Sequence, residues 1–103
     1  MRFEWDEAKR RINLTRHGID FEQAEQVFDG FTDTVSDDRF DYGERRFVTF
    51  GFLQGQVVAI VHMENEDSTN IRIISIRKAS KHEEIAFFQK IWNRHKEAPG
   101  DEG

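Results

Sequence analysis

The sequence contains no cysteine, which excludes disulfide bonds and thiolate metal sites and removes any requirement for an oxidising compartment. It has one proline, and no run approaches the ~18 to 20 consecutive apolar residues that a membrane-spanning helix needs. The N-terminus lacks the basic stretch followed by an apolar stretch that marks a secretory signal. We therefore expect a cytoplasmic protein with no membrane partner.

Charged and aromatic side chains are plentiful by contrast. The chain is 37% hydrophobic and 34% charged, and ten Phe and two Trp supply the apolar area for a core, as in a globular protein rather than a disordered one. A length of 103 residues allows one such core and not two. We expect a single domain over residues 1–96, followed by a flexible tail over residues 97–103.

Charge is segregated along the chain, although the net charge is −5. Residues 1–18 hold five basic and three acidic side chains, whereas residues 19–44 hold one basic and nine acidic ones. Residues 45–96 are basic again, with nine cations and five carboxylates. A site for an anion, built from the first and third segments, is compatible with this distribution.

The N-terminal quarter is expected to be a short strand followed by two helices. "FEW" suits the strand, Asp6 can cap a helix that Gly18 ends, and Ala8 and Ile12 lie four apart on its expected apolar side. A capping-box spacing, Asp20 to Gln23, opens the second helix. Its expected buried stripe comprises Phe21, Ala24, Val27 and Phe28.

From about residue 32 the pattern changes to strands joined by short turns. An edge strand at "DTVSDDR", then "RRFVTFGFL", the apolar central strand "VVAIVHM" and "IRIISIRK" give four strands, with "QGQ" as a hairpin connection. Ser80 and Glu83 form another capping box that opens a C-terminal helix. The expected buried stripe of that helix is Ile85, Phe88, Ile91 and Trp92. The order β-α-α-β-β-β-β-α predicts an α+β domain with a mostly antiparallel sheet.

Arginines on the last strand suggest where an anion could bind. If Ile74 and Ile76 face a helix layer, Ser75 and Arg77 face the opposite, open side of the sheet. Arginine offers permanent charge and planar paired donors, which suit a phosphodiester. The alternative is that these arginines pair with the carboxylates of the acidic block, and the residue pattern alone favours that alternative.

No recognised catalytic motif accompanies them. The four histidines (His17, His62, His82 and His95) have no metal-ligand spacing, and the chain has no glycine-rich phosphate loop and no Gly-x-Ser-x-Gly. His62 is most simply a hydrogen-bonded core or rim side chain. His17 can stabilise the end of its helix as a cation, or act as an acid or base. The aromatic residues at 87, 88 and 92 suit a core better than a surface on which RNA bases stack.

Three stretches resemble a known family in order and spacing. The stretches are "FEWDEAKRRINLTRHGIDFEQA", "DYGERRF" and "RIISIRKA", and they resemble the BrnT family, small bacterial toxins of type II toxin–antitoxin modules. In the first stretch the residues that carry the resemblance are Phe3, Trp5, Asp6, Lys9, Asn13, His17, Gly18, Phe21 and Ala24. The resemblance covers roughly residues 3–92.

The resemblance implies a RelE-like fold and a metal-independent endoribonuclease that needs no cofactor and blocks translation. The partner that it implies is a BrnA-like antitoxin with a ribbon-helix-helix domain, in a heterotetramer that binds operator DNA through the antitoxin. The site residues that it implies are Lys9, His17, Glu44, Arg46 and Arg77 for catalysis, with Arg72 as an RNA contact.

In such a site the ribose 2′-hydroxyl attacks the phosphorus, and the protein orients it, neutralises the phosphorane and protonates the leaving oxygen. Arg77 and Arg46 would stabilise the charge, His17 or Glu44 would be the base or acid, and Lys9 would contact a phosphate. Arg10 and Arg11, outside the motif, are expected to be solvated. Two other functions stay open: a non-catalytic module that binds its antitoxin and co-represses, and an enzyme acting on an unrelated anionic metabolite.

Overall fold

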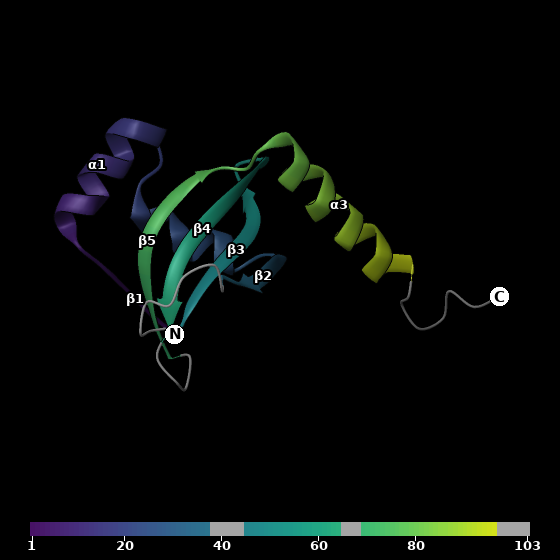
Figure 1. Ribbon diagram of the computed structural model, residues 1–103, viewed down its shortest axis with the longest axis horizontal. Coiled ribbons are helices and arrows are strands. Elements are labelled where there is room, and N and C mark those ends of the chain that lie inside the picture. The colour runs from purple at the N-terminus through teal and green to yellow at the C-terminus, as the bar shows by residue number, and fades with distance from the viewer. Residues whose placement is uncertain (38–44, 65–68, 97–103) are drawn as a thin grey trace.

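The structure, a computed structural model, describes residues 1–37, 45–64 and 69–96. The elements are β1 (Arg2–Trp5), α1 (Glu7–His17), the 3-10 turn η1 (Phe21–Gln23), α2 (Ala24–Phe28), β2 (Thr32–Ser36), β3 (Arg46–Leu53), β4 (Gln56–Glu64), β5 (Asn70–Lys78) and α3 (Lys81–Lys96). In this part of the chain the strands form one five-stranded sheet, in the order β1-β5-β4-β3-β2. Figure 1 shows α2 behind the sheet, α1 beside β5, and α3 extending away from it.

The α+β class is confirmed, and the sheet is mixed. β1 runs parallel to β5, whereas the other neighbouring strands pair antiparallel. β4, the apolar strand expected at the centre, does lie in the middle, and β2 is at an edge as expected. The strand "FEW" therefore joins the same sheet as the four later strands, at the edge opposite β2.

Local sequence signals start and end the first helices as expected. Asp6 accepts a hydrogen bond from the Lys9 backbone N–H at 3.1 Å, and Gly18 ends α1 in the left-handed region at φ 71°. Asp20 and Gln23 form the expected capping box, but it opens η1, which leads into the short α2. The caps were readable because they depend on neighbours within a few residues.

The sheet face that α2 covers holds the larger core cluster. Its buried side chains are Phe21, Ala24, Val27, Leu53, Val58, Ile60, Ile71, Ile73 and Ile76. Helix and sheet approach closely at Gly51, where an added Cβ would lie 2.7 Å from Cγ1 of Val27. The tight approach explains why β3 carries a glycine at this position. The expected stripe on the second helix is confirmed, with Phe28 half-buried.

α1 meets the sheet through a polar residue rather than an apolar stripe. Asn13 is buried, its Nδ2 donates to the Ile76 backbone oxygen at 2.9 Å, and its Oδ1 accepts from the Ile76 N–H at 3.1 Å. β1 pairs with β5 up to Ile73, and the Asn13 amide continues that pairing further along the strand. The prediction that Ala8 and Ile12 face the core is wrong, since both are exposed.

α3 begins as expected and packs differently. Ser80 and Glu83 form the capping box. The prediction that Ile85, Phe88 and Trp92 are buried is wrong, because all three are exposed. Phe87 is the buried side chain, in a second cluster with Val57 and Ala79 on the sheet face opposite α2, and Ile91 packs partly against it. A period of 3.6 residues marks an apolar stripe but does not tell which stripe contacts the sheet.

Among the described residues, no helix has the length and apolar character that crossing a bilayer requires.

Candidate anion-binding site

A β-bulge on β5 determines which arginines share a face. Ser75 lies opposite Val61 and Ile73 lies opposite His62, so Ile74 is an extra residue with no partner position on β4. Strict alternation would put Arg72 on the same face as Ile76, behind the sheet. The extra residue reverses that, and Arg72, Ser75 and Arg77 share the face opposite α2.

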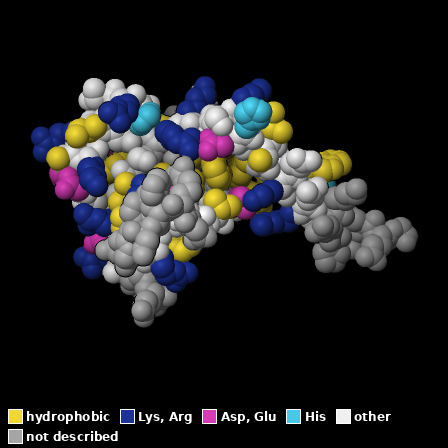
Figure 2. Space-filling view, in the orientation of Figure 1, with side chains coloured by type: hydrophobic (Ala, Val, Ile, Leu, Met, Phe, Trp, Pro, Cys, Tyr) yellow, Lys and Arg dark blue, Asp and Glu magenta, His cyan; other side chains and the backbone are white. Residues whose placement is uncertain are grey.

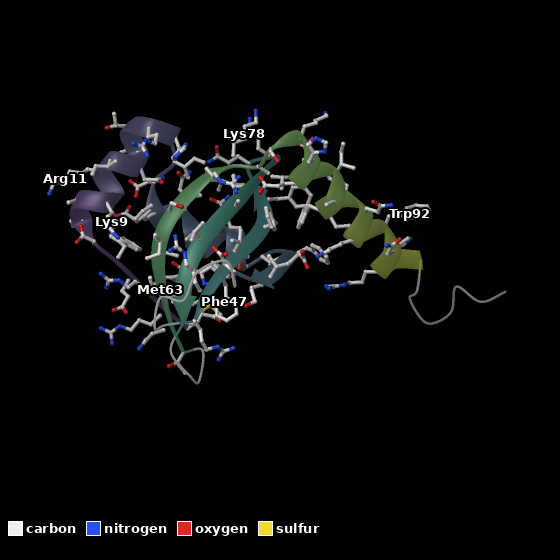
Figure 3. The ribbon with its side chains drawn as sticks, viewed as in Figure 1. Lys9, Arg11, Phe47, Met63, Lys78 and Trp92 are labelled. Carbon is white, nitrogen blue, oxygen red and sulfur yellow. The ribbon has the colours of Figure 1, made fainter. Side chains whose placement is uncertain are left out.

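We call this surface the arginine face. Arg72 lies opposite Met63 on β4, and Met63 lies opposite Arg46 on β3. Neighbouring strands lie about 4.8 Å apart, so the Cα atoms of Arg72 and Arg46 are about 10 Å apart. Along β5, Arg72 and Arg77 are separated by roughly 13 Å, because their partners Met63 and Ala59 are four residues apart on β4. Figure 2 views the molecule from this side, and Figure 3 labels Met63 in the same orientation.

Arg77 is held by a carboxylate of α3. Its Nη1 and Nη2 donate to Oε1 and Oε2 of Glu83 at 2.7 and 2.9 Å, a paired geometry. The Arg77 hydrogen bonds lower the pKa of Glu83 to about 2, so the carboxylate is ionised at neutral pH. Glu83 thus occupies on Arg77 the position that a phosphate would take.

The other two arginines differ in their partners. Nε of Arg46 lies 3.8 Å from Oδ2 of Asp37, whose side chain is nearly buried. Pairing with the acidic block is therefore confirmed for Arg46, whereas the carboxylate that Arg77 contacts, Glu83, lies outside that block. Arg72 is exposed, and no carboxylate in the described ranges pairs with it. It is the cation of the arginine face best placed to meet an incoming anion.

Lys9 and His17 lie on the side of α1 that faces β5. Lys9 lies four residues before Asn13 and His17 lies four residues after it, so the three side chains follow one line along the helix. Because Asn13 bonds to Ile76, that line borders the strand segment that carries Arg77. Figure 3 shows Lys9 between α1 and the sheet, and Arg11 on the outer side of the helix. Both Lys9 and His17 are exposed.

Arg10 is not a solvated side chain, contrary to the sequence prediction. Its Nε and Nη2 donate to the two carboxylate oxygens of Asp20 at 2.8 and 2.9 Å, and its Nη1 bonds to Glu7 at 3.0 Å. These bonds tie α1 to the start of η1, and they lower the pKa of Asp20. Arg10 is thus a structural residue, whereas Arg11 is exposed as expected.

The remaining predicted site residues are placed as follows. Glu44 lies outside the described residues. No cluster of three or more His, Asp or Glu suitable for a metal ion occurs within the described ranges. His62 is buried on the α2 face and accepts or donates a hydrogen bond with Thr49 at 2.7 Å, which confirms the core interpretation. It does not join the arginine face.

Sequence reasoning missed the role of Glu83. The Ser80–Glu83 capping spacing was recognised, but the pairing of Glu83 with Arg77 was not. The two residues are six apart across a strand-to-helix junction, a distance at which no sequence period brings side chains together. The signal that was available is that a capping-box carboxylate directly follows a strand ending in cations.

The described part of the chain is thus an α+β domain with three arginines on one sheet face and a helix beside it. Residues 5–83 match the profile of a family described as "Ribonuclease toxin, BrnT, of type II toxin-antitoxin system". The match covers most of the chain, and the protein belongs to the BrnT toxin family. A search of curated proteins found no match. Family membership implies a ribonuclease toxin and an antitoxin partner.

Proposed function

We propose that this protein is a RelE-like, metal-independent endoribonuclease that acts in the cytoplasm, cleaves RNA through the ribose 2′-hydroxyl and thereby inhibits translation. Membership of a ribonuclease toxin family supports the activity. The observation that carries the placement of the site is the β-bulge at Ile74, because it brings Arg72 to the face that already holds Arg46 and Arg77. Without it, Arg72 would be directed toward the α2 core.

The chemical roles follow from what each side chain can do. Arg72 and Arg77 would bind the scissile phosphate and stabilise the charge that develops on the phosphorane, with Arg46 as a third cation. His17 or Glu44 would act as general base or acid, and Lys9 would contact a neighbouring phosphate from α1. The reaction needs no electron transfer and no external nucleophile, since the attacking oxygen belongs to the substrate.

The proposed partner is a BrnA-like antitoxin with a ribbon-helix-helix domain, in a heterotetramer. We propose that operator DNA is bound by the complex through that domain rather than by this chain. The excess of carboxylates over cations in this protein supports that division, because binding to duplex DNA draws most of its affinity from cations on phosphates.

One observation favours a second candidate function, a non-catalytic module that binds its antitoxin and co-represses. Both Nη atoms of Arg77 are engaged by Glu83, so an RNA phosphate has to displace a carboxylate to use them. In the ribonuclease that displacement is part of substrate binding. If the protein is a co-repressor, no phosphate displaces Glu83, and the Arg77–Glu83 ion pair has only a structural role.

The test is cleavage of bulk RNA by the purified protein with EDTA present. Arg77→Lys should lower the rate by roughly 10² to 10³, or about 3 to 4 kcal/mol, because lysine cannot supply two parallel donors. Arg72→Ala should lower it by a similar factor. The matched control is Arg11→Ala, which removes an exposed cation from the outer side of α1 and should leave the rate within about twofold of wild type.

Three results would contradict the proposal. Loss of cleavage in EDTA would rule out the metal-independent mechanism. Equal rates for wild type, Arg72→Ala and Arg77→Lys would show that the arginine face does not act on RNA, and absence of cleavage by wild type would favour the co-repressor.

A further inference from the structure

Ser75 lies midway between two arginines of the arginine face. It is opposite Val61 on β4, two residues from the position that Arg72 faces and two residues from the position that Arg77 faces. The β-bulge therefore leaves Ser75 roughly 6.5 Å along the strand from each arginine. A ligand that contacts both arginines has to pass over this serine.

The row of side chains to which Ser75 belongs is apolar and partly exposed. Val61 lies opposite Val48 on β3, so the row across the sheet consists of Val48, Val61 and Ser75, all half-buried. The cluster that α3 builds around Phe87 on this face includes neither of the two valines. The row is therefore an apolar strip that ends in one hydroxyl.

The same end of the row borders α1. Pairing of β1 with β5 stops at Ile73, and beyond it Asn13 bonds to the backbone of Ile76, the residue after Ser75. The line of α1 that carries His17 thus runs beside the strand segment that carries the serine. A candidate general base and an uncharged hydroxyl border the same part of the arginine face.

The Ser75 hydroxyl has no partner within the protein in the ranges that the structure describes. Hydroxyls on the opposite face are engaged: Oγ1 of Thr49 bonds to Oγ1 of Thr34 and to Nε2 of His62, both at 2.7 Å. A serine hydroxyl can donate one hydrogen bond and accept two. At Ser75 this capacity is left to water or to a ligand.

The ligand group that suits Ser75 is a sugar hydroxyl rather than a phosphate. Arg72 and Arg77 carry permanent charge on long side chains and are the natural partners of phosphate oxygens, whereas Oγ of Ser75 is uncharged and stays near the sheet. Between successive phosphates of an RNA strand lies a ribose, whose 2′-hydroxyl both donates and accepts, as a serine does. The carbon atoms of that sugar suit the neighbouring valines.

A nucleobase is a less suitable occupant of this row. Bases stack on aromatic rings, and Val48 and Val61 offer none. The ring in the next row, Phe50, packs against the cluster around Phe87. A contact through Ser75 should therefore depend on the sugar and not on the base sequence.

We propose that Ser75 hydrogen-bonds to a ribose 2′-hydroxyl and thereby makes the arginine face prefer RNA over single-stranded DNA. The inference rests on the proposed ribonuclease function, in which that hydroxyl is the nucleophile, and it names the residue that recognises the hydroxyl. Ser75 orients the 2′-hydroxyl and does not take its proton, which passes to the general base. The arginines cannot make this distinction, because the phosphates that they contact occur in both nucleic acids.

The experiment measures the affinity of the full chain for a short labelled RNA and for a DNA strand of the same base sequence, with deoxyuridine in place of thymidine. Fluorescence anisotropy is recorded in the cold, and a gel verifies afterwards that the RNA is intact. Wild type should bind the RNA at least about fivefold more tightly. Ser75→Ala should weaken RNA binding by about fivefold, the factor of one uncharged hydrogen bond, and leave DNA binding unchanged.

Three further variants separate a sugar contact from other effects. Ser75→Thr keeps a hydroxyl and should restore most of the preference for RNA. Arg72→Ala should weaken RNA and DNA binding by the same factor, because it removes a phosphate contact. Thr15→Ala removes an exposed hydroxyl from α1 and should change neither affinity. Urea unfolding of Ser75→Ala should match wild type, since no hydrogen bond within the described ranges is lost.

Equal weakening of RNA and DNA binding by Ser75→Ala would overturn the inference and assign the serine to a phosphate. Wild-type affinities in Ser75→Ala, or no preference for RNA in wild type, would overturn it as well. RNA cleavage is measured on the same proteins. If wild type cleaves no RNA while Ser75→Ala loses the preference for RNA, the proposed ribonuclease function fails and the sugar contact stands. If wild type cleaves RNA and Ser75→Ala binds both strands as wild type does, the function stands and the sugar contact fails.

Discussion

The side-chain amide of Asn13 bonds to the backbone of β5 at Ile76, beyond Ile73, where the pairing with β1 ends. It makes three hydrogen bonds, two with Ile76 and one from Nδ2 to the Ile19 backbone oxygen at 3.0 Å. A buried edge of a sheet has to satisfy its backbone groups, and here a single side chain does so. At the scale of the residue, Asn13 therefore joins α1 to the sheet and sets the position of Lys9 and His17 on either side of it.

Asn13→Leu should destabilise the protein by about 3 kcal/mol. The leucine matches the volume but leaves the N–H and oxygen of Ile76 and the oxygen of Ile19 without their side-chain partner, and buried unsatisfied groups cost ~1 to 3 kcal/mol each. Urea unfolding followed by circular dichroism measures the loss. Thr15→Ala, at an exposed position on the same helix, should change the free energy of unfolding by less than about 0.5 kcal/mol. An Asn13→Leu protein as stable as wild type would mean that water or a shifted helix replaces the amide.

His62 is the buried titratable group of the α2 face. Its ring lies against Phe28 and Phe47, with centroid distances of 5.5 and 5.8 Å. Nε2 bonds to Oγ1 of Thr49, which bonds in turn to Oγ1 of Thr34 on the edge strand at 2.7 Å. Burial lowers the pKa of His62 to about 4, because the charged imidazolium loses its hydration.

The free energy of unfolding should consequently decrease as the pH is lowered through the window that the two pKa values of His62 define. The unfolded chain binds a proton near pH 6.5 and the folded chain near pH 4, so the stabilisation is complete above 6.5 and is lost as the pH falls to 4. The stabilisation that is lost over this pH range amounts to about 3 kcal/mol. The free energy of unfolding, measured between pH 7 and 4, should drop by that much more in wild type than in His62→Gln. Parallel curves for the two proteins would show that His62 has the same pKa in the folded and the unfolded chain.

At the scale of the element, the junction between β5 and α3 connects the arginine face to the C-terminal helix. Arg77 is the next-to-last residue of β5, Ser80 caps α3, and Glu83 bonds to both of them. One carboxylate therefore starts α3 and holds the side chain that we propose for phosphate binding. The C-terminal helix and the strand that carries the arginines share this contact.

Glu83→Gln should strengthen binding of a short RNA severalfold while lowering the free energy of unfolding by about 1 kcal/mol. Glutamine keeps the shape of the cap and removes the negative charge that competes with phosphate for Arg77, and the ion pair is partly exposed, so its loss costs little. Fluorescence anisotropy with a labelled RNA gives the affinity, and Glu84→Gln, whose partner is Lys81, is the control. Weaker RNA binding by Glu83→Gln would show that the carboxylate orients Arg77 rather than competing for its ligand.

At the scale of the whole molecule, an acidic protein presents a basic surface. The net charge is −5, yet four of the proposed RNA contacts, Lys9, Arg46, Arg72 and Arg77, are cations gathered on or beside one sheet face. The field far from the protein repels RNA, and the attraction acts at short range.

RNA affinity should therefore depend on salt only moderately. With about three phosphate contacts on a single strand, the slope of log K against log salt should be near −2, so that affinity falls roughly 20-fold between 50 and 200 mM salt. Arg72→Ala should reduce the slope by about 0.7, and Arg11→Ala should leave it unchanged. A slope steeper than about −4 would mean that the contact surface extends well beyond the arginine face.

Features that depend on neighbouring residues were determined by the sequence itself. Asp6, Gly18 and the capping boxes at Asp20 and Ser80 start or end helices through contacts within one turn, and they lie where the pattern predicts. Gln54 and Gly55, at φ 50° and 81°, form the turn of the β3–β4 hairpin as expected. The strands themselves were also recognisable, because alternating or continuous apolar residues are a local pattern.

The tertiary structure decided what depends on contacts between distant residues. Alternation placed Arg77 and Ser75 correctly but failed for Arg72, because the bulge at Ile74 is a mismatch between β5 and its partner strand and leaves no mark in β5 alone. The apolar stripe of α3 was assigned to the core, and Phe87 took its place, because a helix with apolar residues on two sides is oriented by the surface that it meets. Asn13 is buried for a like reason: a polar residue is stable in the interior where another element supplies its hydrogen bonds, and here that element is β5, 63 residues further along the chain.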